Sequence, residues 1–491
     1  MHTSIEAMKK ARPHGTTPEF FSRRSAGNAN MINMPELSTE IILDNLRARF
    51  VAEDVYTYIG DIVVSVNPFK HTGNSGMDIM QGYVKEAKTL PLHTPSVLQP
   101  HVYALVGKTH KRMCEVSCSQ SVLISGESGA GKTEAMKLAI AHLGVVTQSS
   151  SGSAGGTDDV ARQVMATNPV MEPIGNAKTT RNNNSSRFGK HIDIQFDEGA
   201  RIIGARTTSY LLEKPRICKH MPGERNYHIL YMLCVASAEI RKAGQLEADY
   251  RHYAILDQEG TIAQVQTWND SEAAQEMDDA LAALGFGAPR RQVIYTLFGL
   301  VLQLGNLQFV SQDSAGGVSL GSRVSNQAQL ELAASMMRVT PAQLQKAVCT
   351  KSISAGKDGP IEKGLDAKQA DSIRNSLCMH LYSLVFDWVV HLVNEVLSAS
   401  SSHLAIGVLD IFGFENFTLN SFPQARARSQ RRAHSCLRTR PCAYGHMPLA
   451  RPDASPSLLA ISSSAHLCIN LTNEPKPRPD PDPNPDSCAS T

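Results

Sequence analysis

Residues Gly126–Thr133 read GESGAGKT, and this stretch decides the fold. It matches the pattern GxxxxGK[ST], in which glycines let successive backbone N–H groups point at phosphate oxygens. The apolar run SVLIS lies directly before it, and the helical pattern EAMKLAIAHL follows it. A glycine-rich turn that binds nothing is the alternative. The order of strand, loop and helix favours phosphate binding instead, because the positive end of the helix adds to the attraction for an anion.

Two side chains at the end of this loop have predicted roles. Lys132 should reach the β- and γ-phosphates of a nucleotide, and the hydroxyl of Thr133 should bind Mg²⁺. The whole loop is therefore a candidate phosphate-binding site, made of Gly126, Glu127, Ser128, Gly129, Ala130, Gly131, Lys132 and Thr133.

The composition is that of a globular protein. Of 491 residues, 42% are hydrophobic and 19% are charged, which excludes a wholly disordered or collagen-like chain. The 48 Lys and Arg residues against 46 Asp and Glu residues leave a net charge of +2. No overall field therefore favours a nucleic-acid partner or an anionic membrane.

Cysteine usage and apolar runs bear on the compartment. The ten cysteines show no dense regular spacing, and the N-terminus lacks the apolar core of a signal peptide, so we expect reduced thiols in an intracellular protein. The longest uncharged stretch, residues 292–312, is interrupted by Gln303, Asn306 and Gln308. We therefore expect a buried helix followed by a strand there, and no membrane span.

Short apolar runs alternate with helical patterns along the chain. Predicted strands cover residues 61–66, 121–125, 192–196 and 404–411, and predicted helices cover residues 133–143, 227–236 and 369–397. Such alternation favours an α/β core with a parallel or mixed sheet. The run SSSGSAGG at residues 149–156 has the composition of a flexible linker.

The composition changes at Pro423. Residues 426–451 are rich in arginine and contain no acidic residue, and prolines alternate with other residues from Pro475 to Pro485. Prolines lack the backbone N–H groups that pair strands, and the segment has little apolar surface to bury. We therefore expect disorder and polyproline-like extension from residue 423 to residue 491.

Two further motifs define the kind of nucleotide site. Residues 182–190 read NNNSSRFGK, and residues 410–415 read DIFGFE at the end of an apolar run. Either motif alone could be an ordinary polar loop or strand end. Together with GESGAGKT, and in this order, they resemble the P-loop, switch I and switch II of myosin motor heads. Kinesins would show SSRSH and DLAGSE at the two later places.

The resemblance extends over residues 33–422. It includes VNPFK at 66–70, NPVMEPIGNAKTTRN at 168–182, YLLEKPRI at 210–217, GERNYHILYMLC at 223–234, LQLGNLQF at 302–309 and LYSLVFDWVVHLVN at 381–394. It implies a central mixed β-sheet of the P-loop NTPase type flanked by helices, with a helical subdomain like the upper 50 kDa part of myosin.

The resemblance also implies catalytic roles. Lys132 should bridge the terminal phosphates, Ser185 and Asn182 should line the phosphates and the attacking water, and the amide of Gly413 should sense the γ-phosphate. Arg187 should pair with Glu415 and close the site. The expected reaction is phosphoryl transfer to water by positioning and electrostatics, without a covalent intermediate.

ATP and Mg²⁺ are the implied cofactors. Thr133 and Ser186 should ligate Mg²⁺, and Asp410 should hold a water bound to that ion. Asn67 and Pro68 of the VNPFK segment should belong to the nucleotide site. One departure affects the base pocket, because the family usually places a tyrosine eight residues after this asparagine and the chain has Ser75 there.

The resemblance breaks after switch II. Residues 423–465 are foreign to the family, residues 466–474 read HLCINLTNE and resume it, and the rest is foreign again. Translated intron-like sequence is the simplest hypothesis for the two foreign stretches. We accordingly expect a disordered leader at residues 1–32, a partial motor domain at 33–422 and an Arg/Pro-rich tail at 423–491.

These features give the functional expectation. The family is a cytoplasmic, cytoskeletal motor ATPase whose partner is the actin filament, and this chain is expected to be a truncated form that does not move actin. The upper part of the actin site should include residues 350–364. The alternatives are a nucleotide-binding regulatory or inactive half-motor without actin-activated ATPase, and a chain that does not fold.

Overall fold

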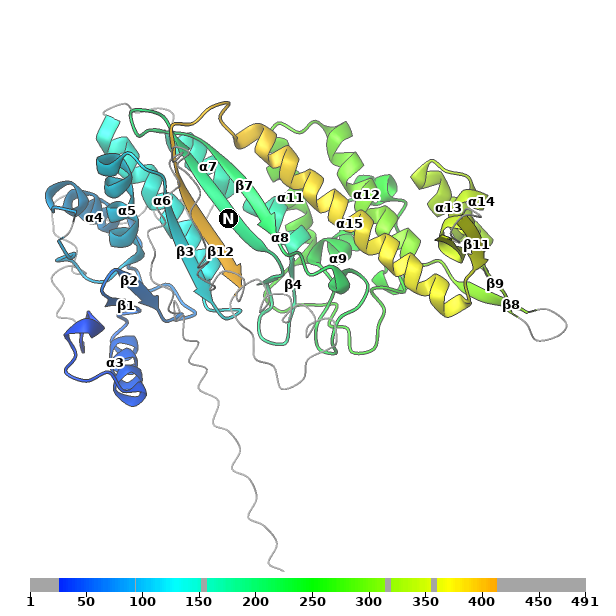
Figure 1. Cartoon of the computed structure of the whole chain (residues 1–491), viewed down its shortest axis with the longest axis horizontal. Coiled ribbons are helices and arrows are strands. Elements are labelled where there is room, and N and C mark those ends of the chain that lie inside the picture. Colours follow the sequence, from blue (N-terminus) through cyan, green and yellow to red (C-terminus); the bar gives the residue numbers. More distant parts are fainter. Residues whose placement is uncertain (1–25, 93, 152–156, 314–318, 355–359, 413–491) are drawn as a thin grey trace, which may run out of the picture.

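The computed structural model describes residues 26–92, 94–151, 157–313, 319–354 and 360–412. The predicted tail at 423–491, with its fragment at 466–474, and most of the predicted leader lie outside these residues. The described part is elongated (Figure 1). The main sheet and α4–α6 lie towards one end, and α13, α14 and the β8–β9 and β10–β11 hairpins lie at the other.

The helices and strands follow one another with short connections. The helices are η1 Met31–Asn33, α3 Thr39–Val51, α4 Met77–Thr89, α5 Val102–Val116, α6 Lys132–Ser151, α7 Thr157–Ala166, α8 Asn168–Gly175, η2 Lys214–Ile217, α9 His228–Val235, α10 Ala238–Gly244, η3 Tyr250–His252, α11 Asp270–Ala283, α12 Ala288–Gly305, α13 Gln327–Met337, α14 Pro341–Cys349 and α15 Ala367–Leu397. The strands are β1 Tyr56–Ile59, β2 Ile62–Ser65, β3 Gln120–Gly126, β4 Asn176–Ala177, β5 Ser185–Ser186, β6 Gly189–Phe196, β7 Ile202–Tyr210, β8 Phe309–Asp313, β9 Ser319–Val324, β10 Thr350–Ser354, β11 Pro360–Gly364 and β12 Leu404–Phe412.

A four-stranded sheet of order β3-β12-β6-β7 forms the centre. β3 and β12 run parallel, with Asp410 opposite Ile124, whereas the β12–β6 and β6–β7 pairs are antiparallel. The sheet is mixed, and the α/β expectation is confirmed. Because the carboxyl ends of parallel strands emerge at one edge, the segments that follow β3 and β12 meet there although they are far apart in sequence.

Helices cover the sheet and extend beyond it. α5 and α6 contact β3, while α7 and α15 contact β7. α15 begins with a capping box, in which the Asp366 side chain accepts a hydrogen bond from the amide of Gln369 and the Gln369 side chain accepts one from the amide of Asp366. The predicted helices at 133–143, 227–236 and 369–397 are all confirmed. The ends of the last two shift by at most two residues, whereas α6 continues well beyond residue 143, to Ser151.

Three local predictions have definite outcomes. Residues 292–312 form the end of α12 and then β8, as expected. The predicted linker at 149–156 is wrong at its start, because α6 continues to Ser151. The expected disorder of the leader is wrong for residues 26–32, because Arg49 donates to the carbonyl of Ala26 and the carbonyl of Ala29 accepts from the amide of Tyr58.

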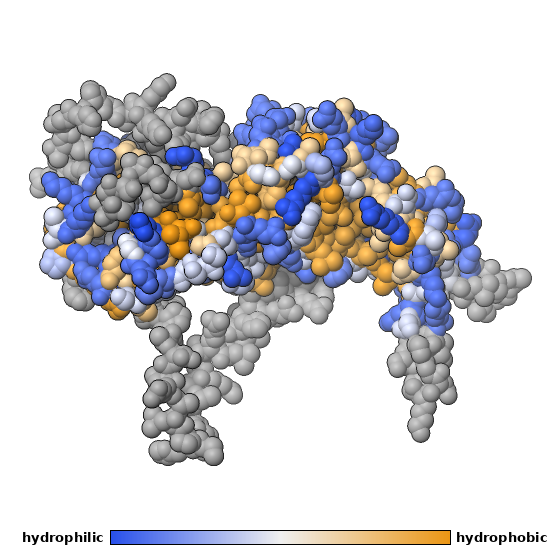
Figure 2. Space-filling view, turned by 90° about the horizontal axis from the view of Figure 1, so that it is seen from above, coloured by the Kyte–Doolittle hydropathy of each residue, from blue (hydrophilic) through white to orange (hydrophobic). Residues whose placement is uncertain are grey.

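α15 is the one described helix long and apolar enough to cross a membrane by length and composition. Half of its apolar window is buried inside the protein, and its contacts with α12, β7 and α14 are those of a core helix. Apolar side chains also gather in a band across the face seen in Figure 2. Ile373, Leu384 and Val396 are exposed apolar side chains of α15.

A cluster of buried aromatic and imidazole rings lies between α5 and α6. His142 is fully buried and stacks on Tyr103 with ring centroids 4.7 Å apart, and His101 lies 4.1 Å from the same tyrosine ring. Neither ring nitrogen of His142 has a hydrogen-bond partner among the described residues. Burial, together with the charge of His110, lowers the pKa of His142 to about 3.

This burial predicts acid sensitivity. Below pH 6.5 the unfolded chain takes up a proton at His142 while the folded chain does not, so the free energy of unfolding should fall by ~1.4 kcal/mol per pH unit from this group alone. His142→Phe removes one of several buried histidines with lowered pKa, so it should reduce the slope of the pH dependence measured by urea denaturation between pH 7.5 and 5 by the share of this group. The exposed His403 is the matched control, and an equal effect of His403→Gln would refute the assignment.

Candidate functional site

The loop between β3 and α6 has a conformation that only glycine adopts easily. Gly129 and Gly131 have φ values of 82° and 91°, in the left-handed region that disfavours other residues. β3 ends at Gly126 and α6 begins at Lys132, so the loop joins a strand end directly to a helix N-terminus. Such a junction directs backbone N–H groups and the positive end of the helix towards the same space.

Lys132 is buried and lies against its own loop. Its Nζ donates to the carbonyl oxygens of Gly126, at 3.0 Å, and Glu127, at 2.8 Å. The hydroxyls of Ser128 and Ser185 lie 2.7 Å apart. The glycine loop is therefore joined to the segment that carries NNNSSR.

Thr133 connects the loop to the end of β12. Its Oγ1 donates to Oδ2 of Asp410 at 3.0 Å. Burial raises the pKa of Asp410, and Lys132, Thr133 and Lys190 act in the opposite direction. Lys190 stands opposite Asp410 in the antiparallel β12–β6 pair. A carboxylate and a hydroxyl thus lie together beside the predicted phosphate site.

The NNNSSR segment is held by its own side chains. Asn182 accepts from the amide of Asn184 at 3.0 Å, and Arg187 donates to Oγ of Ser185 at 3.1 Å. Ser186 donates to the carbonyl of Phe188 at 3.1 Å. The four predicted residues of this segment therefore lie close together, and Ser185 contacts the P-loop.

Arg187 has a partner that the sequence analysis did not identify. Its Nε donates to Oε2 of Glu213 at 2.6 Å. Glu213 also binds Arg216, which in turn binds Glu224. The predicted partner Glu415, and Gly413, lie outside the described residues. YLLEKPRI contains Glu213 and Arg216, and a carboxylate two residues before a proline carries no signal of its role.

Asn67 fixes the loop from the other side. Its Nδ2 donates to the carbonyl of Gly129 at 2.7 Å, and its Oδ1 accepts from the amide of Phe69 at 2.9 Å. Pro68 lies in sequence between Asn67 and Phe69. Ser75, the departure in the predicted base pocket, accepts at its carbonyl from the hydroxyl of Tyr103 at 3.1 Å.

The residues suit Mg²⁺ held mainly by phosphate. In the described part of the chain no three His, Cys, Asp or Glu side chains come together as a metal site. Mg²⁺ commonly keeps several waters and takes only one or two protein oxygens beside substrate phosphates. The Thr133 hydroxyl and the Asp410 carboxylate, 3.0 Å apart, are oxygen ligands of the kind that Mg²⁺ takes from a protein.

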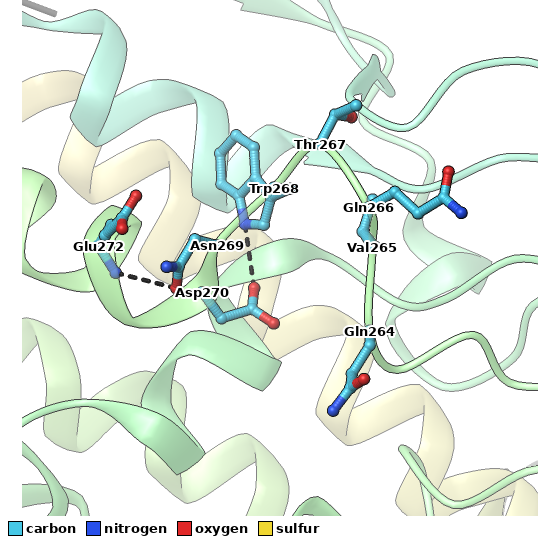
Figure 3. A pocket seen from close by; sticks show the side chains of 8 residues that line it. All are labelled: Gln264, Val265, Gln266, Thr267, Trp268, Asn269, Asp270 and Glu272. Carbon is cyan, nitrogen blue, oxygen red and sulfur yellow. Dashed lines mark hydrogen bonds between the residues drawn. The ribbon is translucent and has the colours of Figure 1, made fainter.

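A polar hollow of about 630 Å³ lies beside switch I, lined by Gln264, Val265, Gln266, Thr267, Trp268, Asn269, Asp270 and Glu272 (Figure 3). The indole of Trp268 donates to Asp270 at 3.0 Å. Asn183 of switch I donates to the hydroxyl of Thr267 at 3.0 Å. The carboxylates of Asp270 and Glu272 in this hollow disfavour a phosphate ligand.

The Glu213 pair gives a stability prediction. Burial raises the pKa of Glu213, but Arg216 and Arg187 outweigh it and hold the pKa at about 2. A depressed pKa means that the ionised carboxylate stabilises the fold above pH 4.5, and that this contribution is lost as the pH falls towards 2. Glu213→Gln should lower the free energy of unfolding at pH 7.5 by about 3 kcal/mol, because two arginines lose a counter-charge.

The matched control is an exposed pair. Asp44 and Arg47 are also an acidic and basic pair, with side chains 72% and 65% exposed. Asp44→Asn should change the free energy of unfolding by less than about 0.5 kcal/mol. Urea denaturation of both variants decides the matter, and equal losses would show that the Glu213 pair has no special weight.

Comparison with known proteins identifies the family. The sequence profile described as myosin head (motor domain) matches residues 28–427. Unconventional myosin-Ia of Rattus norvegicus is 35% identical over 401 residues, which cover 81% of this chain and 46% of the relative. Myosin IB heavy chain of Dictyostelium discoideum is 36% identical over 408 residues, covering 81% and 35%, and Myosin-8 of Arabidopsis thaliana is 36% identical over 412 residues, covering 83% and 26%.

The chain therefore spans less than half the length of these curated relatives. The glycine loop, Ser185 and Asp410, which meet in the structure, lie within the matched range. On this evidence the chain belongs to the myosin head (motor domain) family.

Proposed function

We propose that this chain is a myosin-type motor ATPase unit that binds Mg²⁺ and ATP and hydrolyses ATP by in-line attack of water. The supporting observation is that segments distant in sequence meet at the glycine loop. The glycine loop binds switch I through Ser128 and Ser185, and binds the end of β12 through Thr133 and Asp410. Three segments distant in sequence thus surround one site, in a P-loop NTPase-type arrangement.

The phosphates bind at the loop in this proposal. The amides of residues 126–133 and the N-terminus of α6 attract them, and Lys132 exchanges its two carbonyl partners for phosphate oxygens. Asn67 and Pro68 hold the loop from the base side. Mg²⁺ would neutralise part of the phosphate charge. Thr133 and Ser186 would be its protein ligands, and Asp410 would hold one of its waters.

Hydrolysis depends on positioning. Ser185 and Asn182 orient the attacking water, and Arg187 places positive charge beside Ser185 at 3.1 Å. Gly413 and Glu415 complete the site from switch II in the proposal. A guanidinium shared between Glu213 and Glu415 would let the loop rearrange when the γ-phosphate leaves.

The partner we propose is the actin filament, in the cytoplasm and its cytoskeleton. The motor unit spans residues 33–422, with α9–α15 and the two hairpins as its upper 50 kDa-like subdomain. The β10–β11 hairpin, where Thr350 pairs with Gly364, supplies the upper part of the actin site. Myosins are the named relatives, which supports this assignment.

Gly131 tests the phosphate site. Gly131→Ala meets no atom closer than 3.6 Å, so its cost is backbone strain of about 1–2 kcal/mol. Gly285 has a φ of 87° and nothing within 4 Å, which makes Gly285→Ala a control of equal strain far from the loop. Only Gly131→Ala should weaken binding of a fluorescent ATP analogue, by at least about tenfold. Equal affinities of the two variants would argue against this site.

Actin tests the motor assignment. The full chain should sediment with actin filaments, should be released by Mg²⁺ and ATP, and should hydrolyse ATP faster when filaments are present. A chain that binds ATP but neither sediments with filaments nor responds to them would be the nucleotide-binding unit without actin-activated ATPase. Sedimentation and phosphate release on the same preparation separate the two.

A further inference from the structure

Glu172 is a carboxylate beneath the site that the proposed mechanism does not use. It lies on α8, between the P-loop helix α6 and switch I, and only 15% of its side chain is exposed. Its Oε2 accepts from Nδ2 of Asn184 at 3.2 Å, and its Oε1 lies 3.6 Å from Nζ of Lys137 on α6. One side chain therefore contacts both walls of the phosphate site.

Asn184 carries this contact into switch I. Its Oδ1 accepts from Asn176 at 2.9 Å, so both ends of its amide are held by α8 or the residue that follows it. Its backbone is bound by Asn182, through the amide at 3.0 Å and the carbonyl at 3.4 Å. Because Ser185 follows directly, fixing the Asn184 side chain fixes the residues assigned to the attacking water.

Charge keeps Glu172 in place. Lys137 lies beside Glu172. Burial would lower the pKa of Lys137, but the carboxylates of Glu172 and Glu134 outweigh burial and raise this pKa. Lys190, buried behind Asp410, donates to Asn168 of α8 at 3.1 Å. Burial lowers the pKa of Lys190 to about 8, and the carboxylates of Glu172 and Asp410 limit the fall. The carboxylate of Glu172 is thus paired with Lys137 and also favours the charged form of Lys190.

We propose that Glu172 is a positioning residue, which holds switch I against the P-loop helix through the side chain of Asn184. This inference rests on the proposed function for its catalytic meaning, because a fixed switch I matters only where Ser185 and Asn182 direct water. The position of switch I relative to α6 is argued from the contacts of Glu172 with Asn184 and Lys137 alone. A purely structural ion pair with Lys137 is the competing explanation.

Three variants separate these explanations. Glu172→Met removes the charge and the acceptor, and Glu172→Gln keeps an acceptor oxygen for Asn184. Lys137→Met removes the ion pairs of Lys137 with Glu172 and Glu134 and leaves the contact between Glu172 and Asn184 in place. Amide hydrogen exchange of residues 182–187 in the nucleotide-free, full-length chain reports on switch I directly. The amide of Arg187 bonds to the carbonyl of Gly175, and that of Ser185 lies in the β4–β5 pair.

Glu172→Met should speed exchange in this segment by about tenfold, the loss expected for one hydrogen bond to a charged group. Glu172→Gln and Lys137→Met should leave it within about twofold. Asn184→Ala, which removes the other partner, should reproduce Glu172→Met and serves if Glu172→Met does not fold. Unchanged exchange in Glu172→Met and Asn184→Ala, or faster exchange in Lys137→Met to the same extent, overturns the proposal.

Single-turnover hydrolysis adds the catalytic readout. Glu172→Met should slow the hydrolysis step by about tenfold with less than a threefold change in the Kd for ATP, because the P-loop itself is untouched. Glu172→Gln should restore the rate. If the wild-type chain binds no ATP, the proposed function fails while the exchange data still decide the position of switch I. A loss confined to ATP affinity contradicts the positioning role.

Discussion

The hydrogen bond between Thr133 and Asp410 joins residues that are 277 positions apart, and the arrangement of the site depends on it. It exists because β3 and β12 pair in parallel, so that their carboxyl ends emerge together. The chain from α6 to α15 lies between these two strands, so their pairing is non-local and its loop-closure entropy slows assembly of the site.

Buried charge is organised around the same edge. Lys132, Lys190 and Lys137 alternate with Asp410 and Glu172, and a second series runs from Arg187 through Glu213 and Arg216 to Glu224. Each charge is tolerated because a partner of opposite sign lies close to it. The site is thus a polar layer in which each buried charge depends on its partners.

Sequence reasoning identified the fold class, the main strands and the glycine loop because those signals are local. A run of apolar residues before GESGAGKT, and helical spacing after it, need no knowledge of the rest of the chain. It could not identify Glu213 as a partner of Arg187, or Glu172 as a contact of Asn184, because these pairs arise from packing of segments that meet only in three dimensions. The error at Ser149–Ser151 has a local cause, since serine and glycine composition predicts a linker while the preceding turns of α6 extend the helix into it. The ordered residues 26–32 depend on contacts with α3 and β1, which no pattern in the leader reveals.

α15 has a mechanical consequence that its role in the core does not suggest. With 31 residues it is about 46 Å long, and it contacts β7 near one end and α14 and β8 towards the other, so it runs from the sheet to the region of the hairpins (Figure 1). A capped, proline-free helix behaves as a stiff rod. A tilt of roughly 5° at the sheet would displace the far end by about 4 Å over that length. Small changes in sheet twist are thereby converted into side-chain-sized movements at the opposite end of the molecule.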